Sequence, residues 1–365
     1  GRTDINSGGV YSGQLLNALS QNITDWESID RALRNHFRIR FWLGLFDHFD
    51  SPYWHVPESA VHTEESENLN VQAAMESLIL LRNNDNTLPL KPGSTVAVIG
   101  PHGDAQGDLL GNYLGEICPF EQQTCFRSIL DAITTSNVGG KTLYAQGCDV
   151  FCTDTSGFGQ AVETAHEADV VLIFAGINQQ IEREGHDRVS IDLPGYQHQL
   201  IANLTAIGKP TVLVLINGGM VAIDKEATTV DAIIEAGYPG YQGAVALANT
   251  IFGANDHLGG KLPFTLYAND SIQEFDFFDM DISTAPGRTY RFYTGTPTYP
   301  FGHGLSYTTF SVEWSPQPPT PGPSNLDSGN VASGAGLLDE VVYTITVTNT
   351  GKVAGDEVVQ GYFVP

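Results

Sequence analysis

The sequence has few basic residues. Its 365 residues include 17 lysines and arginines against 42 aspartates and glutamates, which gives a formal net charge of −25. A nucleic-acid-binding protein needs a basic surface to displace the counterions of the phosphates, so this composition argues against such a partner. The chain also lacks an apolar run of about 18 residues, so no membrane-spanning helix is predicted. The charge balance is typical of a soluble protein whose copies repel one another.

Motifs for nucleotides and for zinc are also missing. Glycines follow two of the apolar runs, but neither Gly-x-Gly-x-x-Gly nor a Walker motif is present, which excludes a nucleotide-binding loop there. The four cysteines contain no Cys-x-x-Cys spacing, and their even number favours two disulfides over a zinc site. Four cysteines allow three pairings, and the short spacings favour Cys118–Cys125 and Cys148–Cys152.

Three N-glycosylation sequons are present, and they begin at Asn22, Asn203 and Asn269. Together with the predicted disulfides they favour the secretory route and an extracellular location. No signal peptide begins the chain, so we expect a mature fragment or a piece of a longer polypeptide.

Apolar runs alternate with helical segments through the middle of the chain. Such alternation predicts α/β: a doubly wound, mostly parallel α/β sandwich. The predicted strands are 96–101, 170–175, 211–216 and 230–236, and the predicted helices are 62–82, 159–168, 197–207 and 243–252.

The two ends of the chain have different patterns. Near the start, Thr24-Asp25-Trp26-Glu27 is a capping box that opens an amphipathic helix ending near Gly44. Near the end, residues 315–337 are rich in proline, glycine and serine and are predicted to be a flexible insertion. The segments 310–314, 341–347 and 357–364 around it are predicted to be strands.

A polar loop follows Gly176, where the predicted strand 170–175 ends. In open α/β sheets, ligands bind beyond the carboxyl ends of the strands. Glu182 and Glu184 could therefore place one carboxyl group in a cleft while charged neighbours tune its pKa. On spacing alone, a solvated surface loop is the favoured interpretation. The charged neighbours are Arg183, His186, Asp187 and Arg188.

The sequence Ile181-Glu-Arg-Glu-Gly-His-Asp-Arg188, followed by Leu193-Pro-Gly-Tyr-Gln197, closely resembles the acid/base loop of family 3 glycoside hydrolases. The resemblance is nearest to the fungal and plant β-xylosidases, and it reverses the preference for a surface loop. It implies that Glu184, in a Glu-x-x-x-Arg frame with Arg188, is the general acid/base, with Glu182 as the fallback and as a candidate sugar contact. Asn112 and Tyr113 resemble the family's Gly-Asn-Tyr loop, and they either line the sugar site or only shape a disulfide-closed loop.

The resemblance also implies a domain plan. Residues 1–50 resemble the end of a (β/α)8 barrel, 51–61 a linker, 62–304 an α/β sandwich, and 305–365 the start of a fibronectin type III-like domain. The family's nucleophile is an aspartate before a tryptophan or cysteine, and Asp25-Trp26 imitates that motif. Because Asp25 has a capping role and follows the motif's expected place, the nucleophile is expected upstream of Gly1.

The implied function is retaining hydrolysis by an exo-acting β-xylosidase that releases terminal β-D-xylose from xylo-oligosaccharides. It needs no metal or organic cofactor, and its expected partners are the sugar substrate and the N-terminal barrel part of the same polypeptide. Without that part the chain is expected to be inactive. The alternatives are a β-glucosidase or α-L-arabinofuranosidase of the same family, or a non-catalytic carbohydrate-binding fragment.

Overall fold

The computed structural model describes residues 3–47, 52–115, 118, 125–314 and 343–362. The predicted insertion 315–337 lies outside these residues. The chain divides into two compact units, Gly1–Glu67 and Asn68–Pro365, which are described separately.

In its described residues, the first unit holds the helices α1 (Val10–Ser20) and α2 (Trp26–Trp42). The predicted capping box at Thr24 is wrong in one respect: Asp25 is the N-cap of α2, and its carboxylate accepts a hydrogen bond from the Ser28 backbone N–H at 2.7 Å. The short aspartate side chain satisfies a backbone donor that the first helical turn leaves unpaired. Two 3-10 helices follow, η1 (Pro52–His55) and η2 (Glu58–Ala60).

The second unit is organised around a six-stranded sheet with the order β1-β6-β5-β4-β2-β3. All neighbouring strands are parallel except β1, which pairs antiparallel with β6. This confirms the predicted doubly wound, mostly parallel α/β sandwich. The strands are β1 (Ile79–Asn83), β2 (Thr95–Ile99), β3 (Lys141–Ala145), β4 (Val170–Gly176), β5 (Thr211–Ile216) and β6 (Ala232–Gly237).

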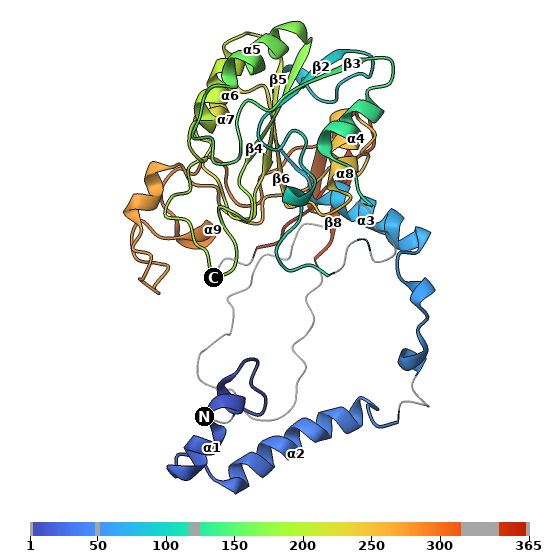
Figure 1. Ribbon diagram of the computed structural model, residues 1–365. Helices are drawn as coiled ribbons and strands as arrows, with labels where there is room; N and C mark the ends of the chain where they lie inside the picture. Colours follow the sequence, from blue (N-terminus) through green and yellow to red (C-terminus); the bar gives the residue numbers. More distant parts are fainter. Residues whose placement is uncertain (1–2, 48–51, 116–117, 119–124, 315–342, 363–365) are drawn as a thin grey trace. The chain divides into compact units, whose positions relative to one another are not determined.

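Helices cover both faces of the sheet (Figure 1), and successive residues of the central strands belong to opposite cores. Ile173 faces one core with α5 (Phe158–Glu167) and α6 (Gln197–Thr205), whereas Phe174 faces the other with α4 (Ile129–Ser136) and α8 (Gly243–Ile251). This two-residue period inside fully apolar strands is what a sheet buried on both faces requires. The remaining helices are α3 (Glu64–Ser77), α7 (Glu226–Thr229), α9 (Thr289–Phe292), η3 (Asn84–Asn86), η4 (Gly107–Leu109) and η5 (Asp270–Glu274).

The predicted helix over 62–82 is wrong in its last turn. The helix α3 ends at Ser77, and Ile79–Asn83 forms the edge strand β1. Ile79, Leu80 and Leu81 are all buried, as expected for a strand between two cores. The prediction failed because a short apolar run of this kind is compatible with both a helix and a strand. The open side of β1 meets the segment 303–305: the Leu305 N–H donates to the Leu80 carbonyl at 2.8 Å, and His303 Nε2 donates to the Leu81 carbonyl at 2.8 Å.

A small antiparallel sheet pairs β7 (Phe310–Trp314) with β8 (Ile345–Asn349), as expected for the start of a fibronectin-like domain. The predicted strand 357–364 is wrong over its described residues, 357–362, which are not a strand. The Lys261 ammonium pairs with Glu357 at 2.8 Å, so side-chain contacts hold this segment without a strand partner. No helix among the described residues is long and apolar enough to cross a membrane.

Candidate active site

The carboxyl ends of β4, β5 and β6 meet at one edge of the sheet because these strands are parallel. Residues 177–195 follow β4 there and are called the glutamate loop below. Residues 217–221 follow β5 and Tyr238 follows β6 at the same edge. The topology therefore brings the predicted site residues of the glutamate loop to the place where α/β proteins bind ligands.

Glu184 stands at the tip of a tight turn in the glutamate loop. The Arg183 N–H donates to the His186 carbonyl at 3.1 Å, and the His186 N–H donates back to the Arg183 carbonyl at 2.9 Å. Gly185 has φ +72°, a conformation that costs glycine little and other residues more. Because only Glu184 and Gly185 lie inside this pair of bonds, the glutamate side chain is exposed and can meet a substrate.

Tyr113 contacts the tip of the glutamate loop. A side-chain hydrogen bond with Glu184 raises the pKa of the Tyr113 phenol. Tyr113 is otherwise 79% exposed, so a ligand can reach both side chains. Asn112 is also exposed, and its side chain makes no hydrogen bond with any residue that the structure describes. Tyr113 and Glu184 thus form the exposed part of the candidate site.

Glu182 is paired with Arg188, across the base of the turn. The guanidinium Nε lies 2.5 Å from Glu182 Oε2, and Nη2 donates to the Met220 carbonyl at 2.8 Å. A Cβ atom at Gly219 would lie 2.3 Å from Glu182 Oε1, so only glycine leaves room for this pair. In the Glu-x-x-x-Arg frame of Glu184 and Arg188, the arginine thus pairs with Glu182.

Three further polar side chains lie near this pair, and the sequence interpretation did not single them out. Asn178 Nδ2 donates to Asp108 at 3.0 Å, and a hydrogen bond from His102 lowers the pKa of Asp108. Burial raises the pKa of the Tyr238 phenol, and the Glu182 charge adds to this effect. Asn178 and Tyr238 come just after strand-ending glycines, and that position was the signal in the sequence that could have found them.

The far end of the glutamate loop is anchored by His198. Its Nδ1 lies 2.6 Å from Glu226, and its Nε2 is hydrogen-bonded to Asp192. Burial alone would lower the pKa of His198, but the hydrogen bonds and charges of Glu226 and Asp192 outweigh it and raise the pKa. His198, hydrogen-bonded to both carboxylates, therefore links Asp192 of the loop to α6 and α7.

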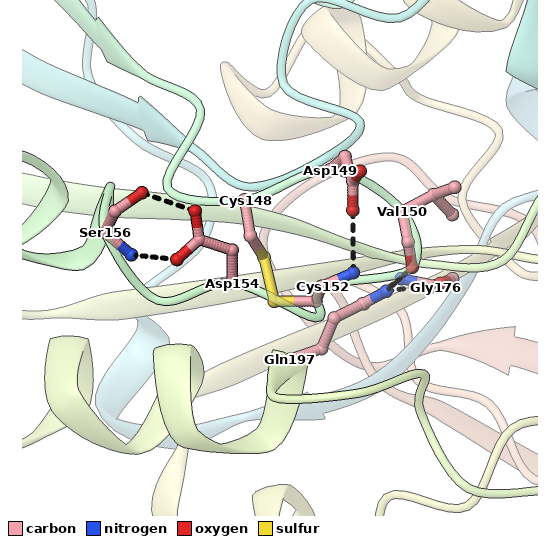
Figure 2. Close-up of a disulfide and its surroundings, with 8 residues drawn as sticks. All are labelled: Cys148, Asp149, Val150, Cys152, Asp154, Ser156, Gly176 and Gln197. Atoms are coloured by element: carbon pink, nitrogen blue, oxygen red, sulfur yellow. Dashed lines mark hydrogen bonds between the residues drawn. A yellow bond between two sulfur atoms is a disulfide. The ribbon is translucent and has the colours of Figure 1, made fainter.

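Both predicted disulfides are present in the structure, Cys118–Cys125 and Cys148–Cys152. The second lies in a loop beside β4, where Figure 2 shows Gln197 reaching Val150 and Gly176. A cavity of about 490 Å³ adjoins this loop, lined by Tyr144 and several polar residues. The three sequons begin at Asn22, which is exposed, and at Asn203 and Asn269, which are partly exposed.

One group of described residues has the donor atoms and spacing of a metal site. Glu76, His257 and Asp356 place their ligand atoms within 4.8 Å of one another. None of them belongs to the glutamate loop, so the chemistry of Glu184 is argued from the side chains alone.

The fold and the site define a doubly wound α/β domain that presents an exposed carboxyl group at the carboxyl edge of its sheet. The model of the glycosyl hydrolase family 3 C-terminal domain matches residues 78–307. The chain therefore belongs to glycoside hydrolase family 3, as its resemblance predicted.

Curated relatives agree with this family. "Beta-D-xylosidase 1" of Arabidopsis thaliana is 37% identical over 345 residues, which cover 91% of this chain and 43% of that protein. "Probable exo-1,4-beta-xylosidase bxlB" of Aspergillus flavus is 37% identical over 367 residues, which cover 97% and 45%. The chain thus spans less than half the length of these relatives.

Solved structures of glycosidases are similar as well. The exo-β-xylosidase XlnD, in complex with a xylobiose aziridine probe, has a TM-score of 0.78 and 36% identity over 85% of this chain and 40% of its own. A β-glucosidase from Erythrobacter marinus has a TM-score of 0.67 and 31% identity over 82% and 42%.

Proposed function

We propose that this chain supplies the general acid/base of a retaining exo-β-xylosidase, and that Glu184 is that residue. The observation that carries the proposal is the position of Glu184, which is exposed at the tip of a turn on the ligand-binding edge of the sheet. The similarity to named β-xylosidases supports xylo-oligosaccharides as the substrate.

The reaction takes place in two steps. A carboxylate nucleophile attacks the anomeric carbon while the bond from that carbon to the glycosidic oxygen breaks, and Glu184 gives its proton to the departing oxygen. Water then attacks the glycosyl–enzyme ester, and the Glu184 carboxylate takes the proton of the water. Tyr113, hydrogen-bonded to Glu184, is placed to hold the carboxyl group toward the sugar. Asn112 and Glu182 are proposed as further sugar contacts.

The nucleophile must lie on a second element, because retaining enzymes hold their two carboxyl groups about 5–5.5 Å apart. We assign it to the barrel domain, the N-terminal part of the same polypeptide. Residues 1–50 are then the end of that barrel, 51–61 the linker, 62–304 the α/β sandwich, and 305–365 the start of the fibronectin-like domain. The chain alone would be inactive. The sequons and disulfides support a secreted glycoprotein.

The test is Glu184→Gln in the complete enzyme. Xylobiose has a poor leaving group that needs protonation, so its turnover should fall about 10²–10⁴-fold. An aryl xyloside with a very good leaving group should lose far less in the first step. The matched control is Glu163→Gln, which removes an exposed carboxyl group from α5 and should change neither rate.

Near-normal xylobiose turnover in Glu184→Gln would move the acid to Glu182. The same assay with aryl glucosides and aryl α-L-arabinofuranosides distinguishes the alternative substrates. Carbohydrate binding without turnover of any of them would indicate a non-catalytic protein.

A further inference from the structure

The two ends of the glutamate loop are joined by one buried side chain. Gln197 is the first residue of α6 and is 1% exposed. Its Oε1 accepts a hydrogen bond from the Gly176 N–H at 2.9 Å, and its Nε2 donates to the Gly176 carbonyl at 2.9 Å. Gly176 immediately precedes the loop and Gln197 follows it two residues after its end. The side-chain amide thus pairs with both backbone groups of Gly176, as a neighbouring strand would.

Gly176 is also closely packed on the side away from Gln197. Its φ is +138°, and a Cβ atom there would lie 2.0 Å from the Ile216 carbonyl oxygen. The next residue, Ile177, donates its N–H to the same carbonyl at 2.9 Å. The start of the glutamate loop is therefore held between β5 on one side and the Gln197 amide on the other.

The Cys148–Cys152 disulfide completes this closure (Figure 2). Gln197 Nε2 also donates to the carbonyl of Val150, inside the disulfide ring, at 2.8 Å. The Tyr196 N–H donates to the Cys152 carbonyl at 2.9 Å, and a Cβ atom at Gly195 would lie 2.4 Å from that carbonyl oxygen. The disulfide ring thus contacts the C-terminal end of the loop directly, and Gln197 connects it to Gly176 at the other end.

We infer that Gln197 is a positioning residue for Glu184, and that the Cys148–Cys152 ring is the support against which it acts. Gln197 touches no substrate. It fixes the direction in which the glutamate loop leaves the sheet, and a shift of about 1 Å in a catalytic group can cost about 100-fold in rate. This inference rests on the proposed role of Glu184.

The experiment compares Gln197→Met with the wild type in the complete enzyme. Methionine keeps the volume and removes the three hydrogen bonds. Displacement of Glu184 should lower kcat/KM for xylobiose about 10–100-fold and leave kcat/KM for a dinitrophenyl xyloside within about threefold, because only xylobiose needs the proton. A loss of folded protein would lower both values equally. Gln160→Met, at an exposed glutamine of α5, is the matched control and should change neither.

Two more variants keep the inference testable if Gln197→Met folds poorly. Gln197→Glu retains the acceptor and, when protonated, one donor, so its xylobiose activity relative to the wild type should recover as the pH falls. The double substitution Cys148→Ser with Cys152→Ser should reproduce the selective loss on xylobiose. Equal losses on both substrates, or no loss, overturn the inference. If Glu184→Gln itself shows no dependence on the leaving group, the proposed function fails and the inference with it.

Discussion

Glu235 is a carboxyl group buried inside the sheet, on β6. Its side chain accepts a hydrogen bond from Asn217 Nδ2 at 2.8 Å, and its other oxygen has no hydrogen-bond partner among the described residues. Burial raises the pKa of Glu235 from 4.5 to about 7. The protonated form removes the buried charge and keeps the bond from Asn217, so it is the form that suits the folded protein at acidic pH.

Glu235 therefore predicts how stability depends on pH. Its pKa is higher in the folded state than in the unfolded state, so its contribution is complete below about pH 4.5 and is lost as the pH rises through about 7. The loss amounts to about 3 kcal/mol of unfolding free energy. Glu235→Gln imitates the neutral acid and should remove this dependence.

Thermal or urea unfolding of wild type and Glu235→Gln between pH 4.5 and 8 measures the effect. Other titrating groups, such as His198, are present in both proteins and cancel in the difference. Glu163→Gln serves as the control for loss of an exposed carboxylate. A difference between wild type and Glu235→Gln that stays constant over this range would show that Glu235 is charged when folded.

At the scale of the elements, the N-terminus of α2 gives Asp25 a structural role, that of a helix cap, and we expect no catalytic role for it. The Asp25 carboxylate caps the Ser28 N–H, and its side-chain hydrogen bond with Ser28 lowers the pKa of Asp25. Serine is an equally good capping residue but is no carboxylate nucleophile. We therefore expect Asp25→Ser in the complete enzyme to keep near-normal xyloside turnover.

Steady-state kinetics on an aryl xyloside checks this expectation, with Asp25→Asn as a second capping variant. Loss of activity in both, with α2 intact by circular dichroism, would place the nucleophile at Asp25.

The elements that could be predicted from sequence are those whose own residues determine them. β4 and β5 are continuous apolar runs, and the structure places them within one residue of the predicted bounds. β3 was missed because it is an edge strand in which only Ala145 is buried, so no apolar run marks it. β1 was assigned to a helix because its pairing with β6 depends on residues about 150 positions away.

In the candidate site too, features set by local sequence could be predicted, and features set by distant residues could not. The glutamate loop could be located from the strand that ends at Gly176. The pairing of Arg188 with Glu182, and the closure by Gln197, could not be predicted, because they depend on where β5 and the disulfide ring lie in space. Local sequence indicates which residues are near the site, and the tertiary fold decides which of them contact one another.

At the scale of the whole molecule, the net charge of −25 should make stability depend on salt. Like charges on the folded protein repel, and raising the ionic strength from about 0.01 to 0.15 M shortens the Debye length from about 30 to 8 Å. We expect Tm at pH 7 to rise over this range of NaCl. Differential scanning calorimetry measures it, with sucrose at equal osmolality as the uncharged control. A fall in Tm would mean that attractive pairs outweigh the repulsion.

The contact of residues 303–305 with β1 should reduce aggregation of the protein at high concentration. An uncovered edge strand offers its backbone groups to another molecule, and edge-to-edge pairing of this kind begins aggregation. Here the carbonyls of Leu80 and Leu81 are already bonded to Leu305 and His303. The opposite edge, β3, begins with the exposed Lys141, whose charge resists the approach of a second strand. Both edge strands of the sheet thus have features that oppose pairing with a strand of another molecule.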